Sequence, residues 1–134
     1  MKNIFTKLAA ILAWIIGAMA IFAGGPVLLG RDPGYYVIGW VPLYNFLIGV
    51  LSFFLTAILI WKGSRMAVPA AWATLGLHSL VMLILQIAYR EVVAVESLTA
   101  MTVRIVVWVI ILVFLWIGSR VKVRQNVSAT GGNL

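Results

Sequence analysis

Four apolar stretches dominate this chain, and each is about as long as a bilayer is thick. They run near residues 8–29, 41–61, 67–89 and 98–118 of the 134-residue sequence. A helix needs about 20 mostly apolar residues to cross the hydrocarbon core, and each stretch reaches that length. We therefore expect an all-α polytopic membrane protein whose four transmembrane helices pack as two hairpins in one bundle.

Little of the chain is left for a separate soluble domain. Hydrophobic residues make up 64% of it and charged residues 10%, which is far from the balance of a soluble globular protein. We expect one transmembrane domain over residues 1–118, followed by a basic, disordered cytoplasmic tail over residues 119–134. Any functional site must then be formed by the helices and the loops between them.

The charged residues are divided unequally between the two sides of the membrane. One side carries seven cations: Lys2, Lys7, Lys62, Arg65, Arg120, Lys122 and Arg124. The other side carries the remaining cations and all three acids: Arg31, Arg90, Arg104, Asp32, Glu91 and Glu96. By the positive-inside rule both termini are expected in the cytoplasm. We expect a multi-pass protein of a bacterial plasma (inner) membrane.

Two other interpretations of the basic residues are less favoured. A net charge of +7 is compatible with nucleic-acid binding, but the cations are split among helix ends and form no continuous stripe. The segment from Lys2 to Lys7 can also be read as the start of a cleaved signal peptide, with Ala18-Met19-Ala20 as the cleavage site. The apolar run continues to Leu29, so we expect an uncleaved first span, and we expect no nucleic-acid partner.

Motifs of soluble enzymes are absent from the sequence. It has no cysteine, which excludes disulfides and thiolate chemistry. It also has no phosphate-binding glycine loop, no nucleophile elbow and no metalloprotease helix motif. We therefore predict no catalytic residues, no metal site and no cofactor, and we favour a non-enzymatic protein.

Small residues recur at helical spacing in the first two spans. They are Ala9, Ala13 and Gly17 in the first span and Gly49, Ser52 and Thr56 in the second. Each set lies on one face of its helix. Such faces usually let two helices approach closely, so we expect packing surfaces; the lining of a permeation path is the alternative.

The second and fourth spans end in similar sequences, Trp61-Lys62-Gly63-Ser64-Arg65 and Trp116-Ile117-Gly118-Ser119-Arg120. Each combines a tryptophan, a residue type typical of the membrane interface, with a glycine and a cation. We expect Gly63 and Gly118 to end their helices. The repeat is consistent with two similar hairpins.

The most informative polar residues lie toward the outer ends of the third and fourth spans. His78, Met82, Gln86 and Arg90 repeat every four residues and therefore share one face of a helix. At about 1.5 Å of rise per residue, Gln86 lies about 6 Å and His78 about 18 Å below Arg90. Arg104 is expected roughly 10 Å inside the next span.

An arginine at that depth costs several kcal/mol unless it reaches outward or meets a partner. One interpretation is an ionic network in which Arg104 pairs with Glu96, joined by Arg90, and sets the register of the helices. The other is a shallow outward-facing polar pocket that binds an anionic headgroup or the polar end of an amphiphile. The candidate ligand-binding residues of that pocket are Asn45, Gln86, Arg90, Glu96 and Arg104.

His78 is expected near the middle of the bilayer. A hydrogen bond to a neighbouring helix is the favoured role, and a proton relay or a ligand for a metal or heme is the alternative. A heme with two histidine ligands needs a second histidine, and His78 is the only one in the chain.

The chain combines much apolar helix surface with no catalytic set of residues. We expect a non-enzymatic accessory or scaffold subunit of a membrane complex. The alternative is a carrier or binding protein for a lipid or other amphiphile, which would use the outward-facing pocket. The expected partners are membrane lipids, together with other membrane protein subunits or further copies of the same chain.

Overall fold

The computed structural model of the chain describes residues 3–131, which form helices and no strands. The helices are α1 (Ile4–Leu28), α2 (Val41–Val50), α3 (Ala57–Trp61), α4 (Ala67–Ile87) and α5 (Val95–Gly131), and a π-helical segment, η1 (Leu51–Thr56), joins α2 to α3. Because α2, η1 and α3 follow one another without a break, they form one continuous rod. As predicted, four helical rods within the described residues are long and apolar enough to span a membrane.

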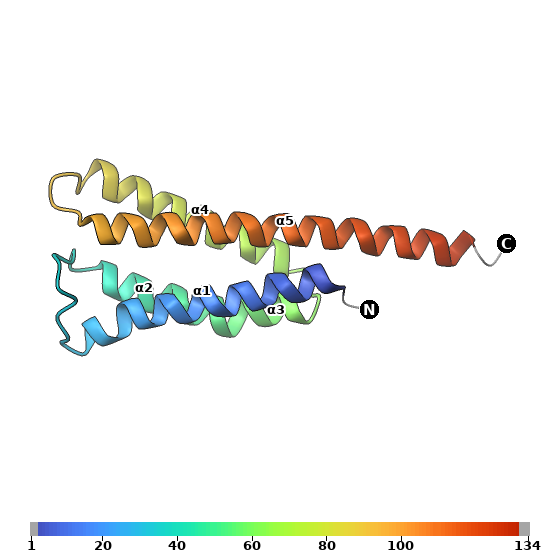
Figure 1. Cartoon of the computed structure of the whole chain (residues 1–134), viewed down its shortest axis with the longest axis horizontal. Coiled ribbons are helices and arrows are strands. Elements are labelled where there is room, and N and C mark those ends of the chain that lie inside the picture. The colour runs from blue at the N-terminus through green and yellow to red at the C-terminus, as the bar shows by residue number, and fades with distance from the viewer. Residues whose placement is uncertain (1–2, 132–134) are drawn as a thin grey trace.

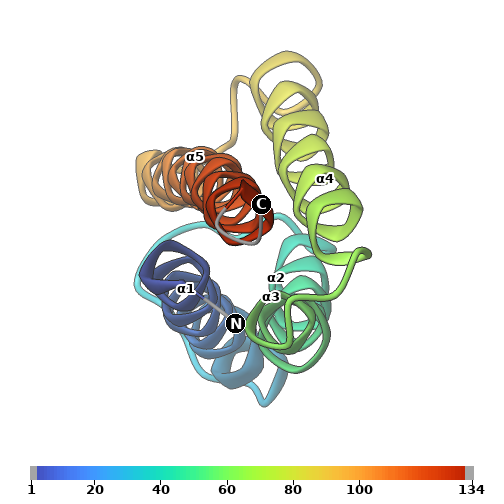
Figure 2. The same ribbon diagram turned by 90° about the vertical axis from the view of Figure 1, so that its right-hand side faces the viewer.

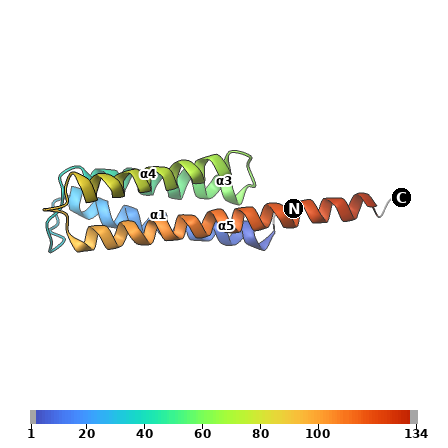
Figure 3. The same cartoon turned by 90° about the horizontal axis from the view of Figure 1, so that it is seen from above.

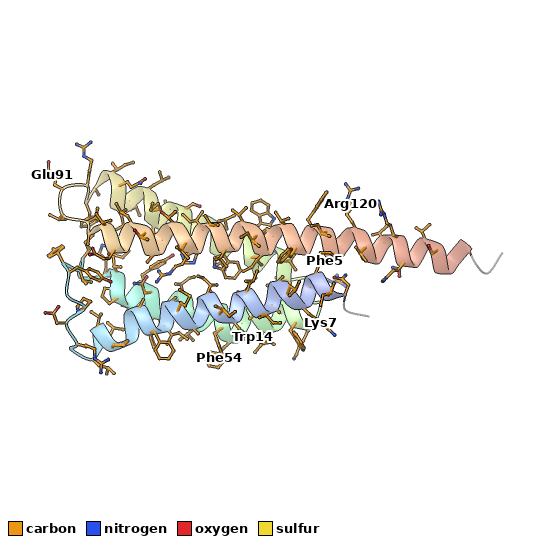
Figure 4. The ribbon with its side chains drawn as sticks, viewed as in Figure 1. Phe5, Lys7, Trp14, Phe54, Glu91 and Arg120 are labelled. Atoms are coloured by element: carbon orange, nitrogen blue, oxygen red, sulfur yellow. The ribbon has the colours of Figure 1, made fainter. Side chains whose placement is uncertain are left out.

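The four rods lie side by side in a bundle (Figures 1 and 2). α1 packs along α2, η1 and α3, and α5 packs against both α1 and α4. α4 packs mainly on α5 and more lightly on α3 and η1. Figure 4 places Lys7 and Arg120 toward one end of the bundle, the basic end, and Glu91 at the other, the acidic end.

The small-residue faces of the first two rods pack directly against each other, as expected. Ala9 and Ala13 are fully buried. A Cβ atom added to Gly17 would lie 2.9 Å from the backbone nitrogen of Phe53, and one added to Gly49 would lie 2.8 Å from the carbonyl oxygen of Gly17. The two backbones therefore touch at Gly17 and Gly49, where no larger side chain fits.

The inward face of α5 carries a run of buried residues with alternating spacings of three and four. They are Met101, Arg104, Trp108, Ile111 and Leu115. This spacing is that of a helix face buried along its whole length. Met101 belongs to an apolar cluster near the acidic end, whereas Trp108, Ile111 and Leu115 belong to a second cluster toward the basic end. Arg104 therefore occupies a core position between the two clusters.

The second rod is wider over the six residues of η1 than in its α-helical parts. The backbone N–H of Ala57 donates to the carbonyl oxygen of Ser52, five residues earlier. Ser52 and Thr56 are both buried. The segment lies about two to three turns beyond Asn45, and such π-helical segments often occur near functional sites.

The end of α4 differs from the sequence prediction, whereas the end of α3 agrees with it. α4 ends at Ile87, so Arg90 lies in the following turn and does not continue the face of His78 and Gln86. At the end of α3, Gly63 has a φ of +69°, a left-handed conformation that glycine adopts without strain. The prediction that Gly63 ends its helix is confirmed.

The prediction for Gly118 is wrong, because α5 continues as a helix through Gly131. Gly118 instead allows α1 and α5 to approach closely: the side-chain amide of Asn3 donates to its carbonyl oxygen at 2.8 Å. An added Cβ at Gly118 would lie 2.9 Å from Oδ1 of Asn3. That same Oδ1 accepts the backbone N–H of Thr6 and caps α1.

The sequence predicts a disordered tail over residues 119–134, but residues 119–131 are helical. Residues 132–134 lie outside the described part of the chain. α5 extends far beyond the other helices at the basic end (Figure 3). No proline or glycine interrupts residues 119–130. An existing helix propagates without a new nucleation cost, so the polar tail can continue the helix of the fourth span.

Candidate functional site

Arg104 is the charged residue buried most deeply among those described. Its side chain is 4% exposed, although it lies in the middle of a hydrophobic helix. Its Nη1 donates a hydrogen bond to Oδ1 of Asn45 at 2.5 Å. Asn45 lies in α2, so this bond joins the second and fourth rods across the interior of the bundle.

The expected ion pair between Arg104 and Glu96 is not formed. Glu96 is exposed in the first turn of α5. Eight residues along a helix correspond to about 12 Å, which is too far for the two side chains to meet once Arg104 turns inward. Within residues 3–131, no acidic side chain forms an ion pair with Arg104. The expected ionic network is therefore absent from the part of the chain that the structure describes.

His78 makes the interhelical hydrogen bond that we expected. It is 1% exposed, and its Nδ1 lies 2.6 Å from the hydroxyl oxygen of Tyr44 on α2. The two rings meet edge to face with centroids 5.8 Å apart. Because Tyr44 and Asn45 are adjacent in sequence, one turn of α2 contacts both α4 and α5 through polar groups.

A second polar contact closes the acidic end of the same region. Nε1 of Trp40 donates to the hydroxyl oxygen of Tyr89 at 3.2 Å. The ring of Trp40 also lies edge-on to the rings of Tyr44 and Tyr89, with centroids 6.4 Å and 6.1 Å away. These aromatic rings link the loop that follows α4 to the first turns of α2.

The five candidate ligand-binding residues do not all come together. Asn45 and Arg104 are in direct contact inside the bundle. Gln86, Arg90 and Glu96 are exposed near the acidic end, and Arg90 lies outside α4. Two of the five residues therefore meet in the interior, while the other three lie on the surface around the same end.

Two features of this region were missed from the sequence. Tyr44 was not singled out, although its position beside Asn45 inside an apolar span was a signal. Trp108 lies one turn of α5 below Arg104 on the same inward face, about 6 Å further toward the basic end. Its Nε1 is buried and has no hydrogen-bond partner among the described residues. A buried donor without an acceptor costs about 1–3 kcal/mol.

Arg104 and Trp108 both bring hydrogen-bond donors to the interior of the bundle. A guanidinium has five N–H donors, and the bond to Asn45 uses one of them. The indole N–H of Trp108 adds a further donor. No group of three or more histidine, cysteine or acidic side chains in residues 3–131 is placed to hold a metal ion. The chemistry that suits this region is recognition of an acceptor, such as a carboxylate, a phosphate or a carbonyl oxygen.

No protein-family model matches the chain, and no curated protein or solved structure matches it either.

Proposed function

We propose that this chain is a multi-pass membrane protein that binds the anionic or acceptor-rich polar end of an amphiphile at Arg104. The observation that carries the proposal is the burial of Arg104 at a core position without a carboxylate partner. A buried charge without an opposite charge costs several kcal/mol. An anionic ligand group would offset that cost, which Asn45 alone does not.

The surroundings of Arg104 support this role. The planar guanidinium can bind a carboxylate or phosphate through two parallel hydrogen bonds, and the bond to Asn45 holds it in one orientation. A low-dielectric interior strengthens such contacts. Asn45, the hydrogen-bond partner of Arg104, lies in the second turn of α2, close to the loop that precedes this helix. The site is therefore close to the acidic end of the bundle, where an amphiphile can present its polar group.

The experiment is isolation of the native protein in polymer nanodiscs, followed by mass spectrometry of the copurifying lipids and other amphiphiles. Arg104→Met keeps the apolar volume and removes the charge, and Arg90→Met removes an exposed arginine near the same end. We expect a specific anionic amphiphile with the native chain and with Arg90→Met, and its loss from Arg104→Met. Equal recovery from all three folded proteins would overturn the proposal.

We further propose that the basic end faces the cytoplasm and that the membrane is a bacterial plasma (inner) membrane. The support is the positive-inside rule, since Lys7 of α1 and Arg120 of α5 lie at that end, together with the loop after α3, which carries Lys62 and Arg65. In this orientation Arg104 belongs to the outer half of the bilayer. The grouping of the four rods as two hairpins, α1 with the second rod and α4 with α5, is part of the same proposal.

A second candidate function, an accessory or scaffold subunit of a membrane complex, is favoured by the extension of α5. Residues 123–128 are exposed along the part of α5 that projects beyond the bundle. Isolated helices of this length are marginal in water, so a partner subunit would stabilise it. Removal of residues 125–134 should then release a stoichiometric protein partner from the purified chain. Retention of that partner by the shortened chain would contradict a docking role for the extension.

A further inference from the structure

A groove between α4 and α5 leads toward the basic end of the bundle. There it continues into a hollow that is lined partly by arginine. The groove has almost entirely apolar walls, formed by Trp72, Leu75, Val109, Leu112, Val113 and Trp116. The hollow is lined by Trp116, Ile117, Arg120, Val121 and Arg124. Trp116 belongs to both, so the two form one continuous surface along the bundle.

The helical register of α5 explains this continuity. Val109, Leu112, Val113 and Trp116 follow the spacing of one helix face, and Arg120 lies one turn after Trp116 on that face. The guanidinium carbon of Arg120 lies over the indole ring of Trp116, 4.8 Å from its centroid. Along this one face of α5 the side chains therefore change from aliphatic to aromatic to cationic, over about 17 Å of helix.

The basic end has no acid of its own to balance these arginines. The chain contains three acidic residues, Asp32, Glu91 and Glu96, and all of them belong to the loops and the first turn of α5 at the acidic end. Arg120 and Arg124 are exposed and have no acidic side chain near them, so an anionic lipid can pair with both. An aliphatic groove joined through a tryptophan to two arginines matches an acyl chain joined to a phosphate.

From this juxtaposition we propose that the groove between α4 and α5 binds one anionic phospholipid. Its acyl chain lies against the walls formed by Trp72, Leu112 and Val113, and its phosphate is held by Arg120 and Arg124. Trp116 lies at the level of the glycerol backbone, as interfacial tryptophans do. The site is independent of the function proposed for Arg104, because Arg120 and Arg124 lie 16 and 20 residues further along α5, about 24 Å and 30 Å away along the helix axis.

The test is native mass spectrometry of the full chain released from nanodiscs that contain equal amounts of phosphatidylglycerol and phosphatidylcholine. Arg120→Gln/Arg124→Gln removes the two cations of the hollow. Lys62→Gln/Arg65→Gln removes two cations at the same end but away from the groove. Each cation near a membrane surface adds roughly 1 kcal/mol of attraction to anionic lipid, so the hollow should enrich bound phosphatidylglycerol by about tenfold or more. We expect the first pair of substitutions to abolish this enrichment and the second pair to preserve it.

Two further measurements separate this site from other sources of binding. Val113→Phe fills the groove without changing any charge, and it should reduce phosphatidylglycerol retention although Arg120 and Arg124 remain. Soluble glycerol phosphate should not displace the lipid. Equal losses from both charge pairs, full retention by Val113→Phe, or displacement by glycerol phosphate would overturn the proposal. So would loss of a protein, and not of a lipid, from the Arg120→Gln/Arg124→Gln variant.

Discussion

The guanidinium of Arg104 and the side-chain oxygen of Asn45 share a hydrogen bond although the two residues are 59 positions apart in the chain. The bond joins two rods whose other contacts in the interior are mostly apolar. A buried guanidinium without any hydrogen-bond acceptor is costly, so the bond to Asn45 stabilises Arg104 in the interior. Asn45 is therefore as important to the interior as Arg104 itself.

We expect Asn45→Ala to destabilise the folded protein by about 1–3 kcal/mol, because it removes the acceptor and leaves Arg104 buried without a partner. Thermal unfolding in detergent measures this effect. Gln86→Ala removes an exposed polar side chain from α4 and should change stability by less than about 0.5 kcal/mol. Adding Arg104→Leu to Asn45→Ala should recover part of the loss, since the unpaired charge is then gone. If the double variant is as unstable as the sum of its parts, the two residues are not coupled.

The contact of α1 with the second rod gives a separate prediction. A Cβ atom at Gly49 would lie 2.7 Å from the backbone nitrogen of Ile21, so Gly49→Ala forces the two helices apart. We expect a loss of about 1–3 kcal/mol in the free energy of unfolding, measured by thermal or denaturant unfolding in the same detergent.

Gly76→Ala is the matched control for Gly49→Ala. Gly76 also lies inside a helix, but an added Cβ there meets nothing within 4 Å. Alanine has the higher helix propensity, so this substitution should be neutral or stabilise by up to about 1 kcal/mol. Similar destabilisation by both alanines would mean that the close approach at Gly49 does not contribute to stability.

The number and type of helices followed from length and composition, because few sequences other than membrane spans keep about 20 apolar residues together. The packing face of Ala9, Ala13 and Gly17 also followed, since helical periodicity alone places these residues together. Asn45 and Arg104 were both identified as polar residues inside apolar spans. Their pairing was not predictable, because it depends on which rods are neighbours and how each is rotated.

The wrong predictions also depended on how the helices pack, which the sequence does not show. Pairing Arg104 with Glu96 assumed that residues on one helix face find each other, whereas packing turned Arg104 inward and left Glu96 at the surface. The residue type of Gly118 predicts a helix end, but its role depends on Asn3, which is 115 positions away. The π-helical segment η1 was not predicted, because it leaves no simple pattern in the sequence.

The bond between Tyr44 and His78 gives a third prediction. Tyr44→Phe keeps the ring contact and removes the hydroxyl that lies 2.6 Å from Nδ1 of His78. Interhelical hydrogen bonds of this kind contribute about 0.6 kcal/mol on average in membrane proteins, and up to about 1.7 kcal/mol. We expect a loss within that range in detergent unfolding, and no change for Tyr36→Phe, which alters an exposed tyrosine. Equal stability of Tyr44→Phe and the native chain would show that the bond contributes nothing.

The orientation proposed for the bundle can be tested with introduced thiols, because the chain has no cysteine to interfere. Tyr36→Cys places a thiol in the exposed loop at the acidic end, and Ser128→Cys places one on the projecting part of α5. A membrane-impermeant maleimide added to intact cells should label Tyr36→Cys alone, and permeabilised cells should show labelling of both. Phe54→Cys, on an exposed side of the second rod (Figure 4), should react in neither case, because lipid covers it. Labelling of Ser128→Cys and not Tyr36→Cys in intact cells would reverse the orientation and move Arg104 to the cytoplasmic half of the bilayer.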